Sequence, residues 1–425
     1  MIYVHIPFCK SRCLYCGFYS NTCAPDGRFV DELCAEALRR RDEIAASSAV
    51  NTLYIGGGTP SVLPLADLGR IADACGGRYY REWTVEVNPD DVTPEYARGL
   101  RELGVNRVSM GVQSLDDGML RWMRRRHDAD GARRAFRSLR DAGFDNISVD
   151  IIFGINGLSM EMLRATVVEI LSWRPEHISS YQLSVDDNSA LRELNRTGDY
   201  CEMDQDDCAD QYDYLCAALA AAGYEHYEIS NWARPGYRAV HNSAYWTRQP
   251  YVGIGPDAHS LLPDNQDIVA SALPRLTQLN TFEGVVTPTA FIPETSTVIT
   301  KRAWKPANPS YFPSEYVFHL PPCGLRTWNS KDLTGWTTGG ELLTLRELWE
   351  EEVMLGLRTS DGIPEQLLKD YPPEDEDNYT PGEYISDPLR NYHLLVPSAI
   401  PGNLRIPESL WLTADDIISS FLELS

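Results

Sequence analysis

Along the first half of the chain, short runs of apolar and β-branched residues alternate with segments of helical periodicity. Phe29 and Leu33 lie four positions apart on one predicted helix face, and Thr93 followed by Pro94 is a typical start for a helix that runs through Leu103. Each apolar run has the length of a buried strand. The predicted strands are Ile2–Ile6, Thr52–Ile55, Trp83–Val87, Arg107–Gly111, Ile147–Phe153 and His177–Leu183.

The spacing of these strands predicts an α/β fold with a parallel sheet. Their first residues are 24 to 50 positions apart, which accommodates a strand, a helix and two connections. Right-handed crossovers between six such units can close the sheet into a partial (β/α)6 barrel of the TIM type. An open doubly wound sheet is the alternative topology.

Composition divides the chain into three predicted parts. Residues 1–260 contain the barrel. Residues 261–340 include a stretch rich in Pro, Thr and Asn with few helical periods, and we expect an irregular or β-containing insertion that connects the other two parts. Residues 341–425 carry 18 acidic and 5 basic side chains, a net charge of −13. They are predicted to form a smaller, mainly helical C-terminal domain with helices at Arg346–Arg358 and Trp411–Leu424.

The overall charge excludes some functions. The 425 residues include 38 basic and 61 acidic side chains, and the resulting net charge of −23 repels phosphate backbones, so no general nucleic-acid binding is expected. No segment approaches the roughly 20 apolar residues that cross a bilayer. The first residues lack the pattern of a secretory signal, so we expect a cytoplasmic protein. In that compartment, clustered members of the ten cysteines suit metal or catalytic ligation better than disulfides.

The strongest chemical signal is the spacing Cys9-x3-Cys13-x2-Cys16, directly after the first predicted strand. Three thiolates on one loop can hold three corners of a [4Fe–4S] cluster, and the fourth iron then stays open to bind and polarise a substrate. The alternative is a zinc site that recruits Cys23 or His5 as its fourth ligand.

Polar and small residues follow the next predicted strands. The segment Gly56–Pro60 follows the second strand, and its glycines let the backbone approach a ligand closely. Glu86 closes the third strand, Gln113 follows the fourth, and Asp150 lies on the fifth. Taken alone, each of these residues could be a polar residue at a strand end whose hydrogen bonds are made within the protein. Together they predict a ring of polar groups at the rim where barrels build active sites.

These motifs resemble the radical S-adenosylmethionine (SAM) superfamily. The resemblance rests on the cysteine loop, the GGGTP turn, Glu86 within VEVNPD, and the segments RVSMGVQS and SVDIIFG. Longer segments are similar to the oxygen-independent coproporphyrinogen III oxidase-like family, and in particular to its heme chaperone (HemW-like) branch. These segments are YVHIPFC, HISSYQLSV, YEISNWARPGYRAVHNSAYW, YVGIGPDAHS and EEVMLGLR, so the resemblance covers about residues 1–260 and resumes near 326–425.

The resemblance implies a set of cofactors and ligands. Cys9, Cys13 and Cys16 would hold the [4Fe–4S] cluster, and the amino and carboxylate groups of SAM would chelate its open iron. An electron from a flavodoxin- or ferredoxin-type donor would then cleave SAM into methionine and a 5′-deoxyadenosyl radical. The positions that match SAM-binding residues of the family are Tyr3, Tyr15, Gly57, Gly58, Thr59, Glu86, Gln113, Arg125 and Asp150.

Two features distinguish the branches of this family. In the oxidase the cluster loop continues to a fourth cysteine and an N-terminal extension precedes the first strand, whereas here Phe18 takes that position and the strand begins at residue 2. The chaperone branch carries a His-Asn-x-x-Tyr-Trp motif, present as His241 to Trp246, and the resemblance implies that His241 ligates heme for transfer to an acceptor protein. The alternatives are an oxidative decarboxylase of coproporphyrinogen III and a degenerate member that only binds, so whether the protein is an enzyme stays open.

Some positions depart from the family pattern. Asn156 stands where the family has proline, Arg124 and Asp257 replace customary glycines, and residues 261–325 are longer than expected. These departures affect the expected geometry of turns near the opening of the predicted SAM site.

A basic stretch surrounds Arg125. From Arg121 to Arg140 there are eight arginines and two aspartates. The stretch is either an exposed helix face with paired charges or a patch that attracts an acidic reductant or porphyrin propionates.

Overall fold

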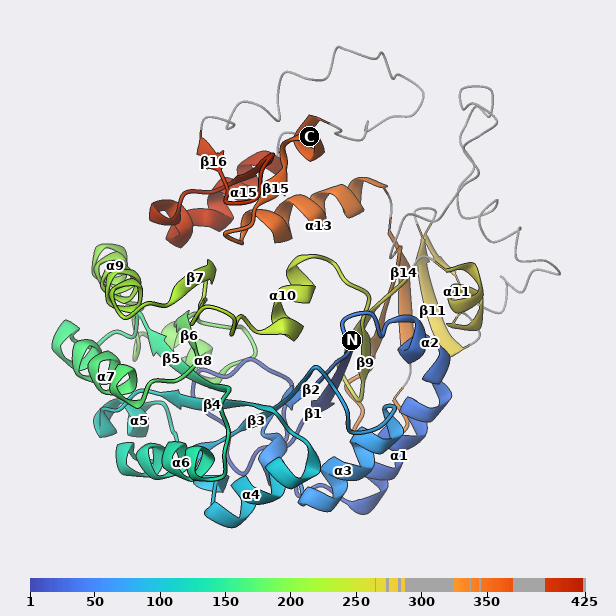
Figure 1. Ribbon diagram of the computed structural model, residues 1–425, viewed down its shortest axis with the longest axis horizontal. Helices are drawn as coiled ribbons and strands as arrows, with labels where there is room; N and C mark the ends of the chain where they lie inside the picture. The colour runs from blue at the N-terminus through green and yellow to red at the C-terminus, as the bar shows by residue number, and fades with distance from the viewer. Residues whose placement is uncertain are drawn as a thin grey trace.

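Nine strands form one sheet in the N-terminal part of the chain (Figure 1). The structure is a computed structural model that describes residues 1–263, 265–272, 275–281, 284–286, 324–336, 338–343, 345–369 and 394–422. The strand order is β7-β8-β6-β5-β4-β3-β2-β1-β9. The bounds are β1 Ile2–Ile6, β2 Thr52–Gly57, β3 Glu82–Val87, β4 Arg107–Gln113, β5 Ile147–Phe153, β6 His177–Gln182, β7 Glu225–Glu228, β8 Asn231–Ala233 and β9 Val252–Ile254.

The strand order decides between the two predicted topologies. Strands β1 to β6 are parallel, and each lies beside its predecessor in the chain. A doubly wound sheet would reverse its strand order at a switch point, and this series has no reversal. The predicted partial barrel is therefore confirmed, with the six predicted strands in place. Strand β9 adds in parallel to β1, and β8 adds antiparallel to β6.

Helices cover the outer face of this sheet (Figure 1). Phe29 and Leu33, which the periodicity placed on one face, are both buried. The covering helices are α1 Gly27–Arg39, α3 Leu65–Ala74, α4 Pro94–Leu103, α6 Ala129–Asp141, α7 Met160–Trp173 and α9 Gln205–Ala221. The shorter helices of this part are α2 Arg41–Ala46, α5 Asp117–Trp122, α8 Ala190–Thr197, α10 Val240–Trp246 and α11 Gln266–Ala272.

Helix α4 shows how local sequence sets an element's ends. The Thr93 hydroxyl accepts a hydrogen bond from the Tyr96 amide, and Pro94 occupies the first helical position, where its missing N–H costs nothing. Gly104 ends the helix at φ 105°, a conformation that suits glycine. The predicted helix and its observed bounds are the same.

A second sheet lies beside the barrel, in the order β10-β13-β14-β11-β12. A buried ion network joins it to the first helices, because the Arg40 guanidinium pairs with Glu36 and Glu43 and also donates to the Ser260 hydroxyl. The predicted insertion thus contains paired strands where it is described; residues 287–323 lie outside the described part. The bounds are β10 His259–Leu262, β11 Leu276–Thr281, β12 Gly284–Val286, β13 Leu325–Asn329 and β14 Thr338–Leu342.

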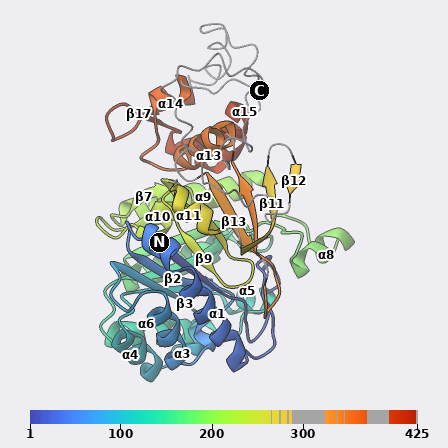
Figure 2. The same ribbon diagram turned by 90° about the vertical axis from the view of Figure 1, so that its right-hand side faces the viewer.

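In the described part of the C-terminal segment, three helices and a small sheet are grouped at one end of the molecule (Figure 2). The helices are α13 Leu345–Leu357, α14 Glu365–Lys369 and α15 Ala414–Leu422, and the sheet contains β15 Ile363–Pro364, β16 Val396–Pro397 and β17 Asn403–Arg405. The predicted closing helix starts later than expected, because Pro407 introduces a 3₁₀ turn over Glu408–Thr413. Among the described residues, no helix is both long and apolar enough to span a bilayer.

Arg124 and Asp257, two of the positions noted in the sequence as departures, adopt a left-handed backbone. Arg124 has φ 58° and Asp257 has φ 59°. Arg124 follows the end of α5, and its conformation lets the Arg125 amide donate to the Leu120 carbonyl at 2.8 Å. Both residues therefore hold a backbone conformation that is unfavourable for a residue with a Cβ.

Replacing Arg124 by glycine should raise the free energy of unfolding by up to about 1 kcal/mol, because glycine adopts this conformation without a Cβ clash. Arg134→Gly is the matched control, since Arg134 is also exposed but lies inside α6, where glycine lowers stability by about 1 kcal/mol. Urea denaturation measures both. Equal destabilisation by the two variants would contradict this account of Arg124.

Candidate functional site

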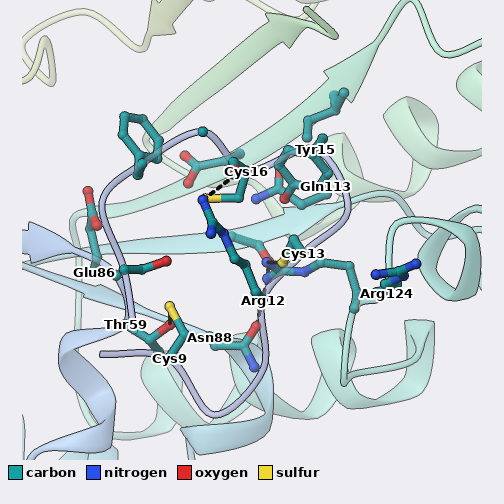
Figure 3. Close-up of a pocket in the computed structure, with 18 of the residues that line it drawn as sticks. Cys9, Arg12, Cys13, Tyr15, Cys16, Thr59, Glu86, Asn88, Gln113 and Arg124 are labelled. Carbon is teal, nitrogen blue, oxygen red and sulfur yellow. Dashed lines mark hydrogen bonds between the residues drawn. The ribbon is translucent and has the colours of Figure 1, made fainter. Parts of the chain in front are cut away.

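The cysteine loop is fixed at both ends by backbone hydrogen bonds. The Cys9 amide donates to the Asn21 carbonyl at 2.9 Å, and the Asn21 amide donates to the Pro7 carbonyl at 2.6 Å. Further along the loop, the Leu14 amide donates to the Met123 carbonyl at 3.1 Å. Cys9, Cys13 and Cys16 are free, half-buried thiols that line one cavity of about 540 Å³ at the carboxyl ends of the barrel strands. Figure 3 shows their sulfur atoms directed into the space that the loop surrounds.

The glycine turn after β2 packs directly on this loop. The Gly58 amide donates to the Ile6 carbonyl and the Thr59 amide to the Phe8 carbonyl, both at 2.8 Å. A Cβ on Gly58 would lie 2.8 Å from each of these two oxygens. The turn therefore braces the loop through its own amides, and the Thr59 hydroxyl also donates to the Cys9 sulfur at 3.4 Å.

Arg125 crosses the floor of the cavity. Its guanidinium donates to the Cys13 sulfur at 3.3 Å and to the Asn88 and Gly111 oxygens at 2.6 Å. A cation beside a sulfur favours the thiolate, which is the form that binds metal. Burial alone acts in the opposite direction and raises the pKa of both Cys9 and Cys16.

Three of the other arginines of the basic stretch are paired with carboxylates. Arg126 pairs with Asp91, Arg133 with Asp130 and Glu169, and Arg140 with Glu176. These pairs favour the structural interpretation of the stretch over a free cationic patch.

Two partly buried carboxyl groups, those of Glu86 and Asp150, lie on β3 and β5 of the barrel. The Tyr54 hydroxyl donates to Glu86 at 2.6 Å, and the Gly57 amide donates to it at 3.0 Å. Burial raises the pKa of Glu86 to about 7 and that of Asp150 to about 6. The Ser109 hydroxyl, which donates to Asp150 at 3.4 Å, lowers that pKa in part. Both groups can take up or release a proton near neutral pH.

Several buried polar atoms of the cavity have no hydrogen-bond partner in the described part of the chain. They include the Ser20 hydroxyl, the Asn88 amide nitrogen, the Gln113 carbonyl oxygen and the Arg125 Nε. A buried polar atom without a hydrogen-bond partner destabilises the folded protein unless a ligand or a water molecule supplies that partner. A nucleotide that carries an ammonium, a carboxylate and ribose hydroxyls offers both the donors and the acceptors that these atoms require. The cavity therefore fits SAM beside a cluster on the three cysteines.

The predicted SAM-binding residues mostly meet in this cavity. Those that line it are Tyr15, Gly57, Gly58, Thr59, Glu86, Gln113, Arg125 and Asp150. Tyr3 lies outside this lining, and its hydroxyl is hydrogen-bonded to His5 Nδ1 at 2.9 Å. Sequence reasoning missed Ser109, although it alternates with Gly111 and Gln113 on β4 and so faces the same side of the sheet.

His241 lies away from the cavity, in the buried start of α10. Its Nδ1 is hydrogen-bonded to the Thr52 hydroxyl at 2.8 Å and its Nε2 to the Tyr245 hydroxyl at 2.9 Å. Burial lowers the pKa of His241 to about 3, so the ring is neutral. Both nitrogens are thus occupied, and iron could bind His241 only after one of these hydrogen bonds opens.

The geometry does not favour zinc at the cysteine loop. Sulfurs around a tetrahedral zinc lie about 3.8 Å apart. Among the described residues, the group whose ligand atoms converge within 4.8 Å is Cys216, His226 and Glu408, and the loop cysteines form no such group. His5, one proposed fourth ligand, uses Nε2 to bind the Tyr19 carbonyl and Nδ1 to bind Tyr3.

The partial barrel and its three-cysteine loop define a radical SAM protein. Residues 3–170 match the family model of the radical SAM superfamily. The chain is 36% identical to the heme chaperone HemW of Lactococcus lactis over 61% of this chain and 69% of that protein, and 32% identical to HemW of Escherichia coli with the same shares. The solved structure of coproporphyrinogen III oxidase (HemN) from E. coli has a TM-score of 0.67 at 17% identity, covering 99% of this chain and 89% of that one.

The chain belongs to the HemN-like family of the radical SAM superfamily, and the heme chaperones named HemW are its relatives at moderate identity. Membership implies a [4Fe–4S] cluster and SAM as cofactors. A further relative, 33% identical over 61% of this chain and 60% of its own length, is a mitochondrial radical SAM domain protein of mouse.

Replacing Gly58 by alanine should strongly reduce cluster incorporation, because the new Cβ would clash with the backbone that carries Cys9. Gly27→Ala is the control, since a Cβ there has no neighbour within 4 Å. Iron and sulfide analysis after anaerobic reconstitution measures the effect. Iron content in Gly58→Ala equal to that of Gly27→Ala would show that the turn does not brace the loop.

Glu86→Gln should flatten the pH dependence of stability. Because folding raises the pKa of Glu86 from 4.5 to about 7, the folded chain keeps a proton that the unfolded chain releases. Stability therefore falls as pH rises between these values, by up to about 3 kcal/mol for a shift of this size. Urea denaturation of the cluster-free protein from pH 5 to 8 compares wild type with the variant, and parallel profiles would refute the assignment.

Proposed function

We propose that this protein is a heme chaperone that holds a [4Fe–4S] cluster and SAM, binds heme and transfers it to acceptor proteins. The observation that carries the proposal is its similarity to several proteins named heme chaperone HemW, at 32 to 36% identity over the barrel. We further propose that it works in the cytoplasm, although the mouse relative is mitochondrial.

In this proposal Cys9, Cys13 and Cys16 are the cluster ligands. When bound, the cluster supplies the electron that radical SAM chemistry requires, and an external flavodoxin- or ferredoxin-type protein is its proposed source. The Thr59 hydroxyl and the Arg125 guanidinium donate hydrogen bonds to two of the sulfurs, those of Cys9 and Cys13.

In the same proposal, the polar groups at the rim of the barrel bind SAM. Glu86 and Asp150 accept hydrogen bonds from hydroxyl or ammonium groups, and the unpartnered Gln113 oxygen accepts another. Arg125 Nε and the Asn88 amide nitrogen are the donors left for a carboxylate. Burial of these groups excludes water and strengthens each contact.

The rival function is oxidation of coproporphyrinogen III. Phe18 argues for the chaperone, because it replaces the extra cysteine of the oxidase loop and its side chain is 70% exposed beside the cluster loop. An exposed aromatic ring in this position suits contact with a macrocycle better than ligation of iron.

Anaerobically reconstituted protein should bind about one heme per chain and release it to an apo-hemoprotein such as apomyoglobin, as followed by Soret absorbance. It should form no protoporphyrinogen from coproporphyrinogen III in the presence of SAM and a reductant. Absence of stoichiometric heme binding would refute the chaperone function, and multiple turnovers of coproporphyrinogen III would establish the oxidase instead.

A further inference from the structure

Three side chains of different chemistry converge where the C-terminal segment meets the barrel. Cys216 comes from α9, His226 from β7 and Glu408 from the 3₁₀ turn that precedes α15. Their ligand atoms, a sulfur, a ring nitrogen and a carboxylate oxygen, all lie within 4.8 Å of one another. His226 is 10 positions from Cys216 and 182 from Glu408, so the tertiary fold brings the group together.

Aromatic contacts hold the His226 ring in one orientation. The ring stacks on Trp232, with centroids 4.0 Å apart and an angle of 13° between the planes, and it meets Trp411 edge to face at 4.3 Å. Both tryptophans are buried, and the His226 side chain is only 4% exposed. An imidazole that is fixed before a ligand arrives loses little conformational entropy when it binds.

Hydrogen bonding sets which nitrogen of His226 faces the other two side chains. Nε2 lies 3.2 Å from the Ile229 carbonyl oxygen, which can only accept, so Nε2 carries a hydrogen. Nδ1 lies 2.7 Å from Glu408 Oε1 and 4.0 Å from the Cys216 sulfur. A proton or another cation must lie between Nδ1 and the carboxylate, because a lone pair and a carboxylate repel each other. Metal-binding histidines usually have this arrangement, with the second nitrogen donating to a carbonyl.

The charge around this group favours a divalent cation. Glu408 and the thiolate form of Cys216 each supply one negative charge, and the Asp213 carboxylate acts on Cys216 from the same helix. Arg405, which acts on Glu408, offsets part of this charge. A divalent cation therefore interacts with the group more strongly than a proton on Nδ1 does.

The ligand types and their spacing suit zinc. A cysteine sulfur, an imidazole nitrogen and a carboxylate oxygen are all common zinc ligands, and tetrahedral zinc bonds of about 2.0 to 2.3 Å place these atoms about 3.3 to 3.6 Å apart. The observed nitrogen–oxygen and nitrogen–sulfur separations of 2.7 Å and 4.0 Å lie on either side of that range. The Glu408 side chain is 45% exposed, so it can move to bind the ion and leave the fourth position to water.

Backbone hydrogen bonds join the barrel to the C-terminal segment along the same strand. The Ile229 amide donates to the Arg358 carbonyl at 3.2 Å, and the Ser360 amide donates to the Tyr227 carbonyl at 3.0 Å. Figure 1 shows β7 on the side of the barrel that faces this segment. A metal ion on His226 would therefore add a ligand bond to a junction that already exists.

We propose that Cys216, His226 and Glu408 form a zinc site, with water as the fourth ligand, that joins the C-terminal segment to the barrel. On binding, the Cys216 thiol and His226 Nδ1 release their protons to solvent, so that a thiolate and a neutral imidazole face the ion. The site uses none of the residues assigned to the cluster, SAM or heme, so it does not rest on the proposed function.

Equilibrium dialysis of the anaerobically reconstituted full chain against zinc, followed by metal analysis, tests this site. The iron–sulfur cluster occupies the loop cysteines, so zinc that binds in addition to the iron reports on other ligands. About one zinc ion should bind per chain, and zinc K-edge X-ray absorption should show a single sulfur ligand with nitrogen and oxygen ligands. Absence of bound zinc, or a shell of three sulfurs from the loop, would overturn the proposal.

Glu408→Gln should weaken zinc binding by about tenfold or more, since even residues behind a metal ligand contribute that much. Glu225→Gln is the matched control, because Glu225 lies beside His226 on β7, its side chain is also 45% exposed, and the same charge is removed. Cys216→Ser should remove the sulfur from the absorption spectrum, whereas Cys201→Ser, at an exposed cysteine outside the group, should leave it in place. Equal zinc affinity in the two glutamine variants would refute the assignment of ligands.

Amide hydrogen exchange measures the link between the two parts. The Leu410 amide donates to the Pro407 carbonyl at 2.9 Å in the turn that carries Glu408. Zinc at about a hundred times its dissociation constant should slow exchange of this amide by up to about a hundredfold where opening releases the ion. The same zinc concentration should have little effect in Glu408→Gln. Zinc that binds to the wild type without slowing this exchange would show that the ion does not join the segment to the barrel.

Discussion

The contact between two backbone segments, the glycine turn after β2 and the loop after β1, is the constraint on which the site depends. Gly58 and Thr59 donate their amides to the carbonyls of Ile6 and Phe8, which directly precede Cys9. At position 58 only glycine fits, because a Cβ there would lie 2.8 Å from both carbonyl oxygens. The parallel pairing of β1 with β2 brings the two segments to the same rim, so the sheet register and the position of the first cysteine are set together.

The electrostatics of the cavity follow from burial at that rim. The carboxyls of Glu86 and Asp150 have raised pKa values because they are withdrawn from water, and the Arg125 guanidinium lies close to the Cys13 sulfur. A cation near the sulfurs and proton-accepting groups in the same cavity suit a cationic nucleotide on an anionic cluster. Unpartnered donors and acceptors in the same cavity give that ligand specific places to bind.

The sequence predicts most of the barrel because its signals are local. Helix α4 begins and ends where its Thr93 cap and Gly104 indicate, and six apolar runs become β1 to β6. The meeting of Cys9, Glu86 and Asp150 in one cavity also follows, since strands of a parallel sheet end at a common rim.

Hydrogen-bond partners were not predictable in the same way, because they come from distant segments. The hydrogen-bond partner of His241 Nδ1 is Thr52, which is 189 positions away. The left-handed backbone at Arg124 shows a further limit, since an arginine in the sequence does not indicate that conformation.

Electron paramagnetic resonance of the reduced, anaerobically reconstituted protein, recorded with and without SAM, tests the central claim most directly. A cluster held by Cys9, Cys13 and Cys16 alone has one iron free for the nucleotide, so the account predicts a [4Fe–4S]⁺ signal whose g values change when SAM is added. A cluster signal that SAM leaves unchanged, or a protein that takes up zinc in place of the cluster, would contradict it.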